Sequence, residues 1–153
     1  MRNVAVLAFT YNERCLKYLE SLNLEADIIF AEEAKRPYVK IPAETIGDTA
    51  MILPELMNAI IEAEKRGYKA VVTWCHGDPG VREVREFVRI PVLGPGEIGM
   101  HVAVMLGQKF SIIVPSLAIK RWIYKNVEAY GFANKLASMR IVEATVDNFL
   151  NSW

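Results

Sequence analysis

Cysteine is scarce in this chain of 153 residues, which contains only Cys15 and Cys75. The two lie far apart, with no Cys-x-x-Cys pair and no cluster of histidine and cysteine. We therefore expect neither a zinc site nor a disulfide framework, and we predict no metal-ligating residues. Scarce, unpaired cysteine is typical of a reducing compartment, so the expected location is the cytoplasm.

An excess of charge is also absent, because 18 lysine and arginine residues balance 18 aspartate and glutamate residues. Without a basic excess the chain has little to neutralise a phosphate backbone, which argues against a nucleic-acid partner. Long apolar runs are missing too, and none approaches the roughly 18 residues that a membrane span requires. The run at residues 4–9 is too short for a signal-peptide core, and we interpret it as a strand.

What the chain does contain is a regular alternation of two patterns. Six short apolar runs are typical of strands covered on both faces: residues 4–9, 26–30, 70–74, 90–93, 110–114 and 136–142. Helical spacing of apolar side chains marks the stretches between them: residues 12–22, 48–67, 78–88, 97–106 and 119–131. Repeated βα units predict an α/β fold with a mostly parallel sheet. Residues 31–47 are polar and are expected to form a long connection that folds over a site.

Capping residues and prolines predict several helix boundaries. Asp48 is expected to cap the helix that ends before Gly67, and Pro54 to kink or restart it. Asp78, with Pro79 at the first helical position, is expected to cap the helix after the third strand. The inner face of that helix is predicted to combine Val81 and Val84 with either Phe87 or Val88.

Cys75 lies where a parallel sheet binds its ligands, at the carboxyl end of the third strand. A thiol near a helix N-terminus experiences the positive end of the helix dipole, so we expect the pKa of Cys75 to lie below about 8.5. The N–H groups of residues 75–80, including that of Gly77, would also bind a substrate carboxylate. The alternative interpretation is a buried, inert cysteine, which is the commoner state of free thiols.

The other candidate residues each have a functional and a structural interpretation. His76 either assists the thiol or binds substrate, or it is a solvated loop residue. Asp78 is expected to be a helix cap first, with a second role in the pocket. Cys15 shares an apolar stripe with Tyr18, Leu19 and Leu22, where a small core side chain is expected.

A glycine-rich segment at residues 94–99 has the G-x-G-x-x-G spelling of a dinucleotide-binding loop. It follows the fourth strand rather than the first, and Pro95 removes one backbone donor. No acidic residue lies about 20 positions further on to bind a ribose. We therefore expect no bound nucleotide.

Several segments occur together in one order through nearly the whole chain: Cys75-His-Gly-Asp-Pro-Gly80, Arg85-Glu86, Ile90-Pro-Val-Leu-Gly-Pro-Gly-Glu97, Leu106-Gly-Gln-Lys-Phe-Ser-Ile-Ile113, Tyr130-Gly131 and Ala137-Ser-Met-Arg140. In these segments the chain resembles the aspartate/glutamate/hydantoin racemase superfamily, and most of all its hydantoin racemase branch. The first and third segments, at this spacing, are the most specific part of the resemblance.

The resemblance implies two Rossmann-like domains with an active site between them, which we place at residues 1–95 and, as a partial domain, at residues 96–153. It implies cofactor-independent racemisation by two cysteines on opposite faces of an amino-acid, hydantoin-like or other small carboxylate substrate. Cys75 matches the first cysteine. The residues expected to contact substrate are Tyr11, Asn12, His76, Gly77, Asp78, Glu97 and Ser116. In the first loop, which contains Tyr11 and Asn12, the family's Asn-Pro-Asn-Thr spelling is largely lost.

The chain departs from this family in length. Family members are longer, and their second cysteine lies in a Gly-Cys-rich loop beyond the point where this sequence stops. Cys15 is not expected to replace it, because it lies on another element and faces the core. A shortened second domain leaves an open sheet edge, so we expect a homo-oligomer. Three functions stay open: a racemase-type isomerase that uses a Cys75 thiolate, an incomplete member that binds small carboxylates or assembles with another chain, and a single-thiol lyase.

Overall fold

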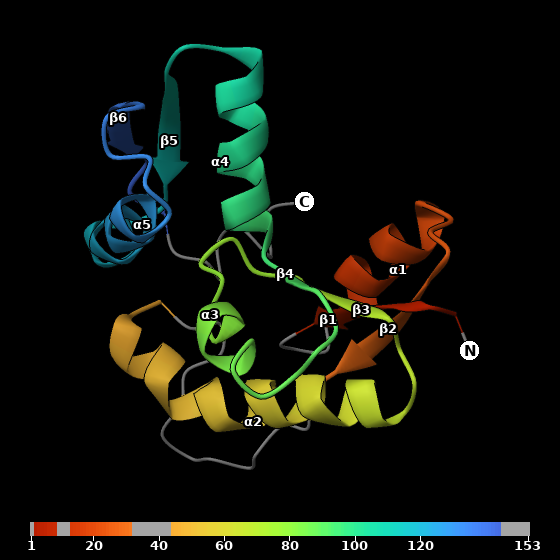
Figure 1. Ribbon diagram of the computed structural model, residues 1–153. Helices are drawn as coiled ribbons and strands as arrows, with labels where there is room; N and C mark the ends of the chain where they lie inside the picture. The colour runs from red at the N-terminus through yellow and green to blue at the C-terminus, as the bar shows by residue number, and fades with distance from the viewer. Residues whose placement is uncertain (1, 9–12, 32–43, 145–153) are drawn as a thin grey trace.

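The computed structural model describes residues 2–8, 13–31 and 44–144, with backbone only for 13–16 (Figure 1). Helices and strands alternate along the chain as expected, and the α/β fold is confirmed. The elements follow one another in this order: β1 (Val4–Ala8), α1 (Glu13–Ser21), β2 (Ala26–Phe30), α2 (Ile46–Lys65), β3 (Ala70–Thr73), α3 (Val81–Val84), β4 (Val92–Leu93), α4 (Pro95–Leu106), β5 (Phe110–Val114), α5 (Leu117–Ala129) and β6 (Leu136–Ile141).

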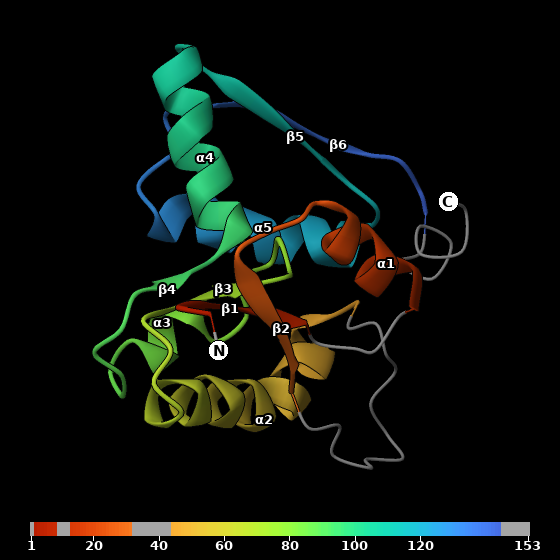
Figure 2. The same ribbon diagram turned by 90° about the vertical axis from the view of Figure 1, so that its right-hand side faces the viewer.

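The strands form two separate parallel sheets. The larger sheet has the order β2-β1-β3-β4, and the smaller one pairs β5 with β6. Leu7 of β1 lies opposite Thr73 of β3, so both strands end at the same edge of the sheet. Helices α2 and α3 lie on one face of the larger sheet and α1 lies on the other (Figure 2). The chain therefore leaves β3 at the edge where an open parallel sheet binds ligands.

Each sheet has its own apolar core. The larger core joins β1, β3 and β4 to α2 and to the chain around α3, and among its buried members are Leu7, Leu56, Ile60, Val71, Val81, Val84 and Val92. The smaller core joins α4, α5 and the strands β5 and β6 through Met100, Val114, Ile123, Val127 and Met139. Removal of these side chains from water is the main driving force that holds each helix on its sheet.

The start of α2 differs from the prediction. Thr45 is the cap, and its hydroxyl oxygen accepts a hydrogen bond from the Asp48 N–H at 3.1 Å, while the Asp48 carboxylate accepts one from the Thr45 N–H at 2.9 Å. This is a capping box, in which an acidic third residue looks like a cap in the sequence. The helix continues through Pro54, because buried residues beyond it anchor the helix to the sheet. Gly67 follows the helix with φ 94°, as predicted for that position.

The predicted apolar face of α1 needs correction, whereas the Val88 alternative predicted after α3 is confirmed. Leu19 of α1 is buried, but Tyr18 and, just after the helix, Leu22 are 57% and 43% exposed, because only the Leu19 side of the helix faces the sheet. The side chain of Cys15 lies outside the described residues. After α3, Val88 joins the core and Phe87 is 64% exposed. No helix in the described part of the chain has both the length and the apolar character that crossing a membrane requires.

Candidate active site

Cys75 begins the loop that connects β3 to α3, residues 75–80, called the cysteine loop below. Trp74 extends the sheet by donating its N–H to the Leu7 carbonyl at 2.8 Å. The loop then turns, and the Asp78 N–H donates to the Cys75 carbonyl at 3.0 Å. Cys75 itself is half-buried, and the Gly77 N–H makes a hydrogen bond to its sulfur.

The helix after the loop begins later than the sequence predicts. Gly80, with φ 74°, occupies the cap position, and α3 contains only the four residues Val81–Val84. Asp78 does not cap α3, since its φ of 49° turns the chain and its carboxylate faces another helix. A single turn carries few aligned peptide dipoles, so it gives little stabilisation to a thiolate at Cys75.

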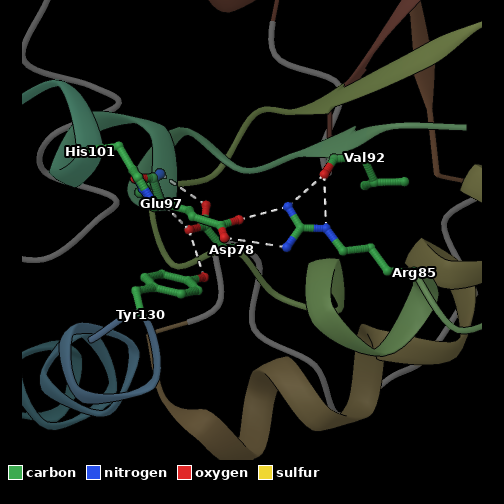
Figure 3. A network of polar contacts seen from close by, with 7 residues as sticks. Asp78, Arg85, Val92, Glu97, His101 and Tyr130 are labelled. Carbon is green, nitrogen blue, oxygen red and sulfur yellow. Dashed lines mark hydrogen bonds and ion pairs between the residues drawn. The ribbon is translucent and has the colours of Figure 1, made fainter. Parts of the chain in front are cut away.

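The Asp78 carboxylate instead occupies the N-terminus of α4 (Figure 3). It accepts hydrogen bonds from the Gly96 N–H at 2.9 Å, the Glu97 N–H at 2.7 Å and the Tyr130 hydroxyl at 2.9 Å. The first helical N–H groups need an acceptor, and the cap residue Gly94 has no side chain to supply one. Asp78 supplies it from 18 residues away, with a negative charge at the positive end of the helix dipole.

The glycines at 94 and 96 make room for this carboxylate. A Cβ atom on Gly94 would lie 2.4 Å from the Asp78 carboxyl carbon, and one on Gly96 would lie 2.4 Å from the His76 carbonyl oxygen. Such distances are far below van der Waals contact. The spelling that resembles a nucleotide loop therefore accommodates an anion that belongs to the protein itself.

Arg85 fixes the same region from the end of α3. Its guanidinium lies 2.6 Å from the Glu97 carboxylate and donates to the Val92 carbonyl at 2.7 Å. His101, one turn further along α4, donates from Nδ1 to the Glu97 carbonyl at 2.9 Å. The Glu97 side chain is thus engaged by Arg85, and its predicted contact with substrate stays a prediction.

Burial controls the ionisation of the site. Burial raises the pKa of Asp78 above its usual range, against the effect of its hydrogen bonds from Gly96, Tyr130 and Glu97. Burial, and then the charge of Asp78, also raises the pKa of Tyr130. The pKa of the Cys75 thiol is raised to about 11, mainly by burial and further by the charge of Asp78, while the Gly77 N–H opposes the shift. The expected lowering of this pKa by a helix dipole was wrong, and Cys75 is a neutral thiol at pH 7.

Five of the predicted site residues lie together: Cys75, His76, Gly77, Asp78 and Glu97. His76 is exposed, whereas Gly77 and Asp78 are buried. The hydroxyl oxygen of Ser116 accepts from the Ile119 N–H at 3.3 Å and caps α5. Tyr11 and Asn12 lie outside the described residues. Within the described ranges, no three potential metal ligands gather at one place.

The sequence did not single out Trp122, Asn126 or Tyr130 as site residues. All three contact the cysteine loop from α5 or its end. Their spacing of four residues was a visible signal of one helix face, but nothing in the sequence indicated which loop that face meets.

The site thus combines a cysteine at the end of a parallel strand with a loop held between two α/β units. The model of the Asp/Glu/Hydantoin racemase family matches residues 11–151, and the chain belongs to this family. The resemblance noted in the sequence is therefore confirmed.

Individual relatives agree with this assignment. The chain is 30% identical over 106 residues to a hydantoin racemase of Pseudomonas sp. (strain NS671). This alignment covers 69% of this chain and 43% of the relative. The chain is also 30% identical over 95 residues to a hydantoin racemase of Paenarthrobacter aurescens, covering 61% of this chain and 40% of the relative. The chain therefore spans less than half the length of these curated relatives.

Solved structures show the same fold. The allantoin racemase from Klebsiella pneumoniae superposes with a TM-score of 0.83 at 20% identity, over 99% of this chain and 62% of that one. The allantoin racemase from Pseudomonas fluorescens gives 0.77 at 18% identity, over 97% and 63%.

Asp78→Asn should make Cys75 easier to ionise, because it removes a negative charge that raises the thiol pKa. In a Cys15→Ala background, the rate of alkylation by iodoacetamide should have a pH midpoint near 11 in the parent and a lower one in the variant. In the folded protein the pKa of Cys75 exceeds the ordinary thiol value of about 8.5. The contribution of the neutral thiol to the free energy of unfolding is therefore fully present below about pH 8.5. It should be lost as the pH rises through about 11. A parent midpoint at or below about 8.5 would contradict this electrostatic description.

Gly96→Ala should destabilise the protein, because its Cβ would lie 2.4 Å from the His76 carbonyl oxygen and 2.6 Å from the Asp78 carboxylate. We expect a loss of about 1–3 kcal/mol in the free energy of unfolding by urea. Gly99→Ala is the matched control in the same helix, since a Cβ there meets nothing within 4 Å. The control should stabilise by up to about 1 kcal/mol through helix propensity. Equal effects of both variants would show that the Asp78 contact is not tight.

Proposed function

We propose that this chain supplies the Cys75 side of a cofactor-independent racemase active site, acting on the α-proton of an amino acid or a hydantoin-like compound. The observation that carries the proposal is the position of Cys75, at the carboxyl end of β3 on a loop that Tyr130 contacts from the end of α5. Membership of the Asp/Glu/Hydantoin racemase family supports it, as do relatives named hydantoin racemase. The domain boundary between residues 95 and 96 belongs to the same proposal, supported by the two separate cores.

The proposed reaction moves one proton at a carbon beside a carbonyl group. A thiolate takes the α-proton and becomes a thiol, while the electron pair of the C–H bond moves into an enolate that backbone N–H groups stabilise. In the reverse direction the thiol gives its proton to the carbanion and becomes a thiolate. With a pKa of about 11, only about one Cys75 in 10⁴ is ionised at pH 7. We infer that the neutral thiol of Cys75 serves as the acid, and that its small thiolate fraction removes the α-proton of the opposite enantiomer.

A proton can change faces only if a second group stands opposite Cys75. The family resemblance implies another cysteine for this role. Cys75 is the one free cysteine in the part of the chain whose side chains are described. We therefore assign one face of the substrate to Cys75 and leave the opposite face to a group outside that part.

The substrate contacts that we propose are Tyr11, Asn12, His76 and Gly77. Asp78, Glu97 and Ser116 were expected to share this role. Their side chains already have partners within the protein, which supports a role in shaping the pocket.

One alternative is favoured by the same high pKa. A neutral thiol is the group needed to protonate a carbanion left by decarboxylation, as in a single-thiol lyase. The remaining alternative is a catalytically incomplete member that binds small carboxylates or assembles with another chain. We also propose a cytoplasmic homo-oligomer. Exposed apolar side chains support association, because Met105, Leu106 and Ile113 are 83%, 85% and 71% exposed.

Cys75→Ser should abolish exchange of the substrate α-proton, because a serine hydroxyl is too weakly acidic to act without a base. The assay incubates each enantiomer of amino acids and hydantoins in heavy water and detects deuterium at the α-carbon by NMR. The parent should incorporate deuterium into one enantiomer with little inversion, since Cys75 is the one thiol among the side chains that the structure describes.

Cys15→Ala is the control and should retain exchange in the folded fraction. Rapid inversion of both enantiomers would show that a second acid operates in this chain. Loss of carbon dioxide from a substituted malonate would favour the lyase. No reaction with any of these compounds would leave the binding protein as the better account.

A further inference from the structure

Helix α5 meets the cysteine loop along a single stripe of side chains. Trp122, Asn126 and Tyr130 are spaced four residues apart, so they lie one above another on the same face of the helix. The neighbouring face carries Ile123 and Val127, which anchor α5 in the core of the smaller sheet. The stripe therefore connects a rigidly packed helix to the loop that carries Cys75.

Gly77 is the point of contact for two of these side chains. Asn126 donates from Nδ2 to the Gly77 carbonyl at 2.8 Å. The indole of Trp122 lies so close that a Cβ on Gly77 would be 2.4 Å from two of its ring carbons. The N–H of the same glycine makes the hydrogen bond to the Cys75 sulfur. Gly77 thus receives Asn126 on its carbonyl side and contacts the thiol on its N–H side.

Tyr130 holds the next residue of the loop. Its hydroxyl donates to the Asp78 carboxylate at 2.9 Å, on the same oxygen that accepts from the Glu97 N–H. Asp78 is 6% exposed, so this contact is shielded from water. Within the loop itself, the turn rests on the hydrogen bond from the Asp78 N–H to the Cys75 carbonyl.

We propose that Trp122, Asn126 and Tyr130 are positioning residues, which set the orientation of the Cys75 thiol from α5 and its C-terminal end. A role of these residues in catalysis rests on the proposed function. Their effect on Cys75 does not, because the environment of Cys75 depends on α5 even though 47 or more residues separate them along the sequence. None of the three side chains needs to touch substrate for this effect.

The test compares Asn126→Ala and Tyr130→Phe with Tyr124→Phe, all in a Cys15→Ala background. Tyr124 lies on α5 with 43% of its surface exposed and is not part of the stripe. Among the described residues, the ionisable groups in the loop or bonded to it include His76, Asp78, Tyr130 and the Glu97–Arg85 pair, and Asn126→Ala alters none of them. The measurements are the pH dependence of Cys75 alkylation by iodoacetamide and, as a check of folding, the urea unfolding midpoint.

Both stripe variants should lower the pH midpoint of Cys75, because a looser loop admits water to a thiol whose pKa is raised by burial. One hydrogen bond is worth about 1 kcal/mol, so we expect about a fivefold faster alkylation at pH 8. Tyr124→Phe should match the parent. Parent-like midpoints and rates in both stripe variants, with the proteins folded, would overturn the proposal.

A steric pair gives an independent readout. Gly77→Ala should shift the Cys75 alkylation rate, because its Cβ meets the Trp122 ring. The double variant Gly77→Ala with Trp122→Leu should bring the rate back toward that of Trp122→Leu alone. Failure of this rescue would show that Trp122 does not control the loop.

Deuterium exchange then separates this inference from the proposed function. If the parent exchanges the α-proton, Asn126→Ala should lower kcat and leave KM nearly unchanged, since Asn126 does not touch substrate. An equal loss through KM would contradict a positioning role. If the parent shows no exchange, the proposed function fails, and the alkylation results still decide whether α5 positions Cys75.

Discussion

The arrangement of this protein depends on one buried carboxylate. Asp78 follows Cys75 by three residues, yet its side chain caps α4 and accepts from Tyr130 at the end of α5. Burial of the charge is unfavourable, as the raised pKa of Asp78 indicates. Three hydrogen bonds and the α4 dipole offset that penalty. Because the donors belong to elements that cover the smaller sheet, this one residue joins the two α/β units at the cysteine loop.

Several other features follow from this contact. Gly94 and Gly96 are small because the carboxylate occupies the space that a side chain would fill. The charge of Asp78, added to burial, keeps Cys75 protonated, with a pKa of about 11. In the proposed reaction, such a site favours the neutral thiol as a proton donor over the thiolate as a base. The chemistry proposed here therefore differs from that expected of a cysteine activated by its own helix.

The sequence predicted the helices and strands well, because apolar periodicity and the glycines that end helices are local signals. It also predicted the family and the place of Cys75 at the end of β3. It failed where the partner of a residue is distant. Asp78-Pro79 reads as the start of a helix, but the groups that Asp78 binds lie 18 to 52 residues away. The predicted burial of Tyr18 and Leu22 was wrong for a related reason, since the width of the covered helix face depends on what packs against it.

Asp78 and Tyr130 connect the cysteine loop to the α/β unit of the smaller sheet, and a double-mutant cycle measures this connection. The free energy of unfolding would be measured for the parent, Asp78→Asn, Tyr130→Phe and the double variant. Hydrogen bonds to charged groups contribute about 1.5–3 kcal/mol, and we predict a coupling energy in that range. Additive effects, with a coupling below about 0.5 kcal/mol, would contradict the account.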